Sequence, residues 1–205
     1  MRDFHIRAAL HHKLLEPYHS DPDTLVIEEL GLKHGSCRAD IAIINGQLTG
    51  FEIKSDQDSL FRLERQVPMY DAVFDAVTAV VGERHRPAVA SFLPIHWGIL
   101  VARETEAGEV HFEIERKSKP NRATDLFAVT QLLWRTEALL LLQTTKLDLD
   151  ARRLRRSLIY EHLVQNFPAV KLREEVRRCL KERSNWRDQR RPSLYDDSFQ
   201  PASTL

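Results

Sequence analysis

Short apolar segments alternate with polar turns along the first half of the chain. Apolar residues follow one face of a helix from about Asp3 to Leu15, and β-branched and apolar residues cluster at 24–30, 37–44 and 48–55. The run from Ala76 to Gly82 is almost wholly apolar and rich in valine. Such a run suits a central strand that is covered on both faces and paired in parallel. The pattern therefore predicts a helix, a meander of three strands, a crossover helix and a parallel strand.

Further strands are expected at Trp97–Arg103 and Val110–Glu115, and helices at 56–74 and 84–92 connect the strands. Strands that alternate with helices in this way are typical of a sheet with helices on its faces. Residues 1–118 are therefore predicted to form a three-layer α/β core with the element order αβββαβ and a mixed sheet.

The pattern changes after the polar segment Lys117–Arg122, which Pro120 interrupts and which is the best linker candidate. Residues 119–183 are predicted to form a basic, all-helical extension. Three helices are expected there, at 125–142, 150–167 and 170–183. The helix at 125–142 carries enough apolar surface to pack on two sides, which favours burial against the core or a homodimer through this helix. Residues 184–205 are polar and are predicted to form a flexible tail.

A β-hairpin is predicted around Asn45-Gly46, a dipeptide that tolerates positive φ between two strands. The length of its loop decides which side chains share a face. A two-residue turn would pair Asp40 with Phe51, whereas a three-residue loop at 45–47, or a symmetric five-residue one, pairs Asp40 with Glu52. We predict the odd-length loop. It places three isoleucines together with Phe51 on the core side, namely Ile41, Ile43 and Ile53.

The predicted hairpin brings two carboxylates close together on a half-buried sheet. Such a pair is costly unless a cation lies between the two groups or one of them stays protonated. Mg²⁺ or Mn²⁺ would satisfy carboxylate and carbonyl oxygens and would activate a bound water. Lys54 shares a strand face with Glu52 and could position or deprotonate that water.

These residues carry a resemblance to a known group of proteins. Asp40 followed by Glu52-Ile53-Lys54 resembles the D…(D/E)xK signature of the PD-(D/E)xK nuclease superfamily, and Gln66 to Tyr70 resembles the QxxxY motif of its RecB-like members. The segment from Val26 to Val81 also looks like a group of little-characterised bacterial proteins. The resemblance covers about the first half of the chain, and Ala39 stands where the signature usually has proline. It implies a restriction endonuclease-like fold for the predicted core.

The resemblance also implies roles for single residues. Lys54, Asp40 and Glu52 would be catalytic, and the metal ion would be held by Asp40, Glu52, Glu29 and the Ile53 carbonyl. We favour Glu29 over its neighbour Glu28 as the additional acid. The reaction would be metal-dependent hydrolysis of phosphodiester bonds, most simply in DNA.

Four further residues are expected to contact nucleic acid. Arg38 lies two positions before Asp40 and should share its face, where it could contact a phosphate or hold the carboxylates in a salt bridge. The other three recur every four residues along the helix that follows the active strand, namely Arg62, Gln66 and Tyr70. Their alternative role is polar packing, which is equally expected for Tyr70.

Charge and composition refine this picture. The chain has 30 basic and 30 acidic residues and no formal net charge. Basic residues nevertheless outnumber acidic ones about two to one from Lys146 to Arg191, as in a face that binds phosphates or in solvated helices. The isolated Cys37 and Cys179 favour neither a disulfide framework nor a zinc site. Neither a signal peptide nor an apolar run of membrane-spanning length is found, so a cytoplasmic protein without a membrane partner is expected.

Three functions are therefore open from the sequence. The first is a divalent-metal-dependent nuclease. The second is a nuclease-like module that binds nucleic acid or a protein partner without cleavage. In the third, the ion pairs are purely structural and Lys54 simply neutralises Asp40 and Glu52.

Overall fold

The computed structural model describes residues 1–145 and 153–184 of the chain. Within these residues lies a six-stranded sheet in the order β1-β2-β3-β4-β5-β6. β1 pairs with β2, β2 with β3, and β5 with β6 in antiparallel fashion, whereas β3, β4 and β5 run parallel to one another. The strands are β1 (Leu25–Leu32), β2 (Cys37–Ile44), β3 (Leu48–Lys54), β4 (Ala76–Gly82), β5 (Gly98–Glu104) and β6 (Val110–Arg116).

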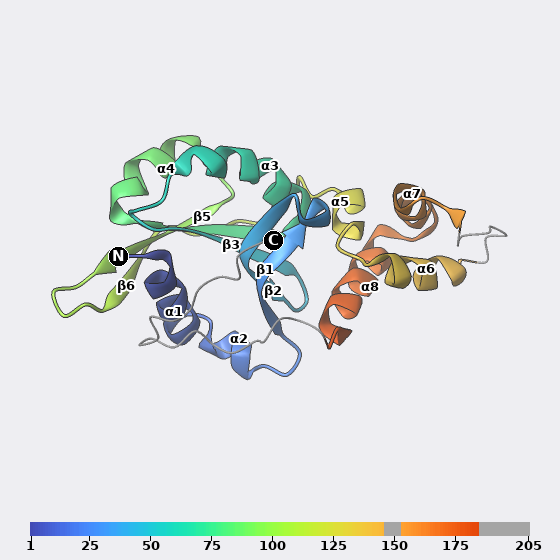
Figure 1. Ribbon diagram of the computed structural model, residues 1–205, viewed down its shortest axis with the longest axis horizontal. Coiled ribbons are helices and arrows are strands. Elements are labelled where there is room, and N and C mark those ends of the chain that lie inside the picture. Colours follow the sequence, from blue (N-terminus) through green and yellow to red (C-terminus); the bar gives the residue numbers. More distant parts are fainter. Residues whose placement is uncertain (146–152, 185–205) are drawn as a thin grey trace.

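Helices cover both faces of the sheet (Figure 1). The helices of the core are α1 (Asp3–Lys13), α2 (Glu16–Ser20), α3 (Leu63–Val73) and α4 (Arg86–Phe92). Apolar residues of α1 pack against one face of the sheet, and those of α3 and α4 pack against the other. The three-layer α/β core with a mixed sheet is thus confirmed. None of the helices in the described ranges combines the length and the apolar character needed to cross a membrane.

The C-terminal part of the described chain is helical, as predicted. Its helices gather beyond the β1 and β2 side of the sheet (Figure 1). They are α5 (Leu126–Thr130), α6 (Arg135–Gln143), α7 (Arg156–Asn166) and α8 (Ala169–Glu182). The predicted helix at 125–142 is divided in two, because the chain turns between α5 and α6. One apolar cluster is shared by the core and these helices, and it includes Tyr70, Val129, Tyr160 and Leu172.

Several predicted boundaries differ from the structure. The helix expected from residue 56 starts only at Leu63, because Asp58 turns back to accept hydrogen bonds from the Ser55 backbone and hydroxyl at 2.7 and 2.6 Å. The expected linker is anchored, since the Asn121 amide donates to the carbonyls of Asp71 and Phe74 at 2.7 and 2.8 Å. The predicted tail lies outside the described residues beyond position 184, as do 150–152 of the predicted 150–167 helix.

The three-residue hairpin loop is confirmed. Ile44 pairs with Leu48, and the side chain of Asn45 accepts a hydrogen bond from the Gln47 backbone at 3.1 Å across the loop. The register places Ile41 opposite Phe51, as predicted. The predicted isoleucines lie in the apolar cluster under α1.

The face of the β1-β2 ribbon that points toward α1 changes beside the predicted site, at a point that we call the turnover of the ribbon. Glu28 pairs with Ile41 and Leu30 pairs with Ala39, but the pairing skips Glu29 and Asp40. Glu29 has a φ of 55°, an uncommon value for a residue with a side chain. Ile41 packs on the α1 face of the sheet, whereas Ala39 packs on the α3 face. The two acidic residues therefore lie where the strands change faces.

Candidate functional site

An arginine that the sequence interpretation missed lies at the centre of the predicted acidic site. Arg7 projects from α1 toward the turnover of the β1-β2 ribbon and is only 5% exposed. Its Nη2 atom lies 3.4 Å from Asp40 Oδ1 and 3.8 Å from Glu29 Oε1. Its other nitrogens lie 3.7 Å from Glu28 Oε2 and 3.2 Å from Asp3 Oδ1. One guanidinium thus faces four carboxylates.

This cluster shifts the pKa values of Arg7 and Glu29. Burial alone would lower the pKa of Arg7, but the surrounding carboxylates outweigh burial and raise it. The pKa of Glu29 is raised, first by burial and then by the charge of Asp40, while Arg7 and Arg38 partly offset both effects. Glu28 and Glu29 both contact Arg7, so the structure gives no reason to prefer Glu29 over Glu28 as the additional acid.

Asp40 joins this cluster to β3. Its Oδ2 atom accepts a hydrogen bond from the Ile53 backbone N–H at 2.6 Å. The Arg7 side chain donates to the Asp40 backbone carbonyl at 3.0 Å. The prediction that Asp40 pairs with Glu52 is wrong, because the ladder between β2 and β3 ends one residue earlier, at Ile41 and Phe51.

A second polar centre lies on β3, beneath α3. Glu52 is 1% exposed, and its two oxygens accept hydrogen bonds from Lys54 and from the Tyr70 hydroxyl. Lys54 also lies 3.3 Å from the Ile53 carbonyl. Burial, followed by the charge of Asp40, raises the pKa of Glu52 to about 7, although Lys54 and Tyr70 oppose the shift. The predicted trio of Asp40, Glu52 and Lys54 is therefore brought together, with its charges paired inside the protein.

Cationic side chains already lie at the predicted metal site. Arg7 and Lys54 provide positive charge next to the carboxylates that were expected to hold Mg²⁺ or Mn²⁺. Within residues 1–145 and 153–184, no group of three or more His, Cys, Asp or Glu side chains is arranged to hold a metal ion. The metal site stays a prediction.

The four predicted nucleic-acid contacts are not equally accessible. Arg38 is exposed and forms an ion pair with Glu29 at 3.3 Å, which is the salt-bridge alternative. Arg62 is exposed at the start of α3. Gln66 is half-buried with its Oε1 atom inside the protein. Tyr70 is fully buried, so it could serve a ligand only by holding Glu52.

A basic surface forms where the turn after β1 meets the start of α7. We define the basic surface as the exposed residues Lys33, His34, Arg155 and Arg156. Arg156 Nη1 lies 3.4 Å from His34 Nδ1, and the His34 ring stacks on Tyr160 with centroids 5.7 Å apart. The sequence indicated a basic extension but not this junction, because its two parts are 122 residues apart along the chain.

Comparison with known proteins gives one family. The family model described as "Bacteriophage P4 protein cII" matches residues 1–194. A curated relative, protein cII of Enterobacteria phage P4, is 33% identical over 115 residues, which is 56% of this chain and 43% of the relative. The match thus spans less than half of the relative's length. No solved structure matches the chain.

These matches correct the functional prediction. They point to the cII family and not to the PD-(D/E)xK superfamily, so the predicted nuclease, hydrolase and enzyme assignments are wrong. The D…ExK signature is short, so a strand with charged residues at alternate positions can match it without forming a nuclease site. Ion pairing accounts equally well for Asp40, Glu52 and Lys54. Lys54 neutralises Glu52, and Arg7 neutralises Asp40.

Proposed function

We propose that this chain, which belongs to the bacteriophage P4 protein cII family, binds nucleic acid, with DNA as the partner to test first, and that it does so without cleaving it. The observation that carries this proposal is the basic surface, where Lys33 and His34 meet Arg155 and Arg156. The contact between His34 and Arg156 joins the turn after β1 to the start of α7, so exposed basic residues from two distant segments lie beside each other.

The electrostatics of α7 support an anionic ligand. Arg155 is the N-cap residue of the helix and Arg156 is its first residue, and the first turn contains no acidic side chain. The N-terminus of a helix carries partial positive charge, so cations there are unfavourable by about 0.3–1 kcal/mol each, and a bound phosphate would relieve the cost. The Arg155 side chain forms no capping hydrogen bond.

The conformation of the neighbouring turn also supports a functional surface. Lys33 and His34 have φ values of 46° and 59°, which side-chain-bearing residues adopt only at a cost. Burial, followed by the charge of Arg156, lowers the pKa of His34. A phosphate at this surface would oppose that shift, because it favours the protonated imidazole.

The polar centres of the core take a structural role in this proposal. Asp40 caps the Ile53 amide where β2 leaves β3, and Glu52 fixes Tyr70 to β3. Such contacts would hold the β1-β2 ribbon at the angle at which its turn reaches α7.

The proposal is tested by fluorescence anisotropy with labelled single-stranded and duplex DNA. We expect Arg155→Ala/Arg156→Ala to weaken binding at least tenfold, since two phosphate contacts are lost. Arg103→Ala is the matched control, because Arg103 is also a partly exposed arginine but is paired with Glu83 and Glu113 and lies on β5, toward the other edge of the sheet. Equal binding by the double variant and the parent would overturn the proposal. The same samples, run on a denaturing gel with Mg²⁺, should show intact DNA.

A further inference from the structure

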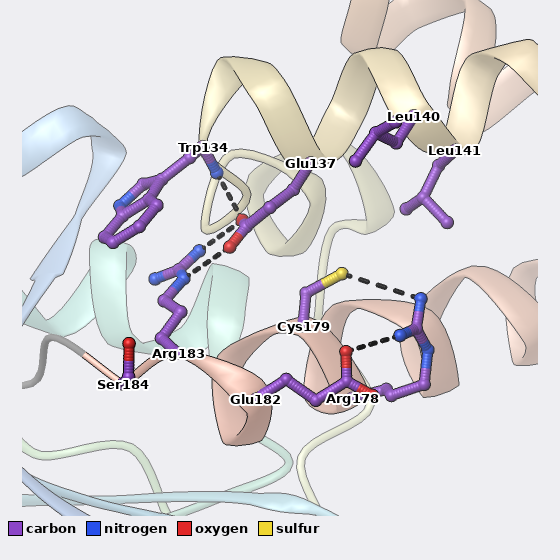
Figure 2. Close-up of a pocket in the computed structure, with 9 residues that line it drawn as sticks. All are labelled: Trp134, Glu137, Leu140, Leu141, Arg178, Cys179, Glu182, Arg183 and Ser184. Atoms are coloured by element: carbon purple, nitrogen blue, oxygen red, sulfur yellow. Dashed lines mark hydrogen bonds and ion pairs between the residues drawn. The ribbon is translucent and has the colours of Figure 1, made fainter.

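A groove of about 340 Å³ lies between α6 and α8 (Figure 2). Its apolar lining includes Leu141 and Cys179, which are nearly buried, and Trp134 and Leu140, which are not. Leu140 is 66% exposed and Trp134 is 49% exposed. Large apolar side chains that remain exposed around a recess commonly mark a surface that binds a partner.

The charged residues at one end of the groove are neutralised within the chain. Arg183 donates two hydrogen bonds to Glu137, at 2.6 and 2.7 Å, and its guanidinium lies 4.3 Å from the centre of the Trp134 ring (Figure 2). Glu137 also accepts a hydrogen bond from the Trp134 backbone N–H at 2.7 Å. This end therefore offers no uncompensated charge to select an ionic small molecule.

The surface along α8 carries both signs of charge. Arg178 lies between Glu175 and Glu182, with separations of 2.7 and 2.6 Å, and all three side chains are partly exposed. A two-fold interface needs a patch that is complementary to itself, in charge as well as in shape. Here Arg178 of one copy can face Glu182 of the other, and the reverse contact follows from the symmetry.

The apolar part of the patch contains both an exposed side chain and buried ones. Leu140, at 66% exposed, lines the same groove as the nearly buried Leu141 and Cys179 (Figure 2). Two copies related by a two-fold axis could each place Leu140 in the recess of the other. We propose that the groove between α6 and α8 binds a second copy of this chain and makes it a homodimer. The dimer goes beyond the proposed binding of nucleic acid and does not depend on it.

Sedimentation velocity of the full chain, without nucleic acid, tests this proposal. We expect a monomer–dimer equilibrium that shifts with protein concentration. Leu140→Glu should raise the dimer dissociation constant at least tenfold, because it places an unpaired carboxylate in the partner's apolar recess. Ile95→Glu is the matched control, since Ile95 is 73% exposed and lies outside the groove. Circular dichroism checks that both variants keep the helical content of the parent.

Two results would overturn the proposal. One is a parent chain that stays monomeric at every concentration. The other is a Leu140→Glu variant that dimerises as well as the parent and the Ile95→Glu control.

Discussion

Asp40 accepts a hydrogen bond from the Ile53 backbone N–H at 2.6 Å, across the point where the ladder between β2 and β3 has already ended. A side chain here replaces a backbone carbonyl as the acceptor. The other Asp40 oxygen lies 3.4 Å from Arg7, so one carboxylate connects β2, β3 and α1.

Removal of this acceptor should destabilise the fold. Asp40→Ala leaves the Ile53 amide without its partner and Arg7 with one carboxylate fewer. We expect a loss of about 1–3 kcal/mol in the free energy of unfolding, measured by urea denaturation. Asp40→Asn keeps an acceptor oxygen and should lose less. Equal losses for the two variants would show that the hydrogen bond to Ile53 contributes little.

Arg7 should contribute most to stability when its carboxylate partners are ionised. Arg7→Met removes the guanidinium but keeps much of its apolar stem. We expect a loss of about 2–3 kcal/mol at pH 7, which is below the cost for a fully buried pair because the carboxylates are partly exposed. The loss should shrink as the pH falls, because protonation of Glu29, whose pKa is raised above its ordinary value of 4.5, removes one of the negative charges that face Arg7. Arg62→Met, at an exposed position, is the control, and a pH-independent loss would contradict this expectation.

Glu52 should make stability depend on pH in a defined direction. Burial raises its pKa from 4.5 to about 7 in the folded state, so between these values the folded protein binds more protons than the unfolded chain. The stabilising contribution is therefore fully present below about pH 4.5 and is lost as the pH rises through 7, with a slope of at most about 1.4 kcal/mol per pH unit. Glu52→Gln should remove this component. Parallel profiles of unfolding free energy for parent and variant would contradict it.

The expected Mg²⁺ or Mn²⁺ site can be tested without an activity assay. A metal ion that binds only the folded state raises the melting temperature with its concentration. Because Arg7 and Lys54 already neutralise the carboxylates, we expect no change in the thermal transition between EDTA and millimolar Mg²⁺ or Mn²⁺. An upward shift that disappears in Asp40→Asn would instead support metal binding at this site.

Much of the core could be predicted because it depends on local signals. Asn45-Gly46 and the alternation around it determined the hairpin loop, and the valine-rich run indicated β4. The position of Glu29 near Asp40 was expected only from the resemblance to a nuclease superfamily, and not from a local signal. Their shared partner Arg7 could not be predicted, because it reaches Asp40 from a helix 33 residues away.

Other features had no local signal. The positive φ of Glu29 results from the turnover of the β1-β2 ribbon, and nothing in the residue type requires it. The contact between His34 and Arg156 depends on how the helical extension packs on the core. The family was also misjudged, because charged residues two apart on a strand serve an ion pair as readily as a metal site.

The salt dependence of DNA binding tests the role of the basic surface most directly. Each phosphate contact contributes about 0.7–0.9 to the slope of the logarithm of the binding constant against the logarithm of salt concentration. If Arg155 and Arg156 each contact a phosphate, Arg155→Ala/Arg156→Ala should reduce the magnitude of that slope by about 1.4–1.8. Arg103→Ala should leave the slope unchanged. A double variant with the slope of the parent, or a parent that does not bind DNA at low salt, would contradict the assignment of this surface to nucleic acid.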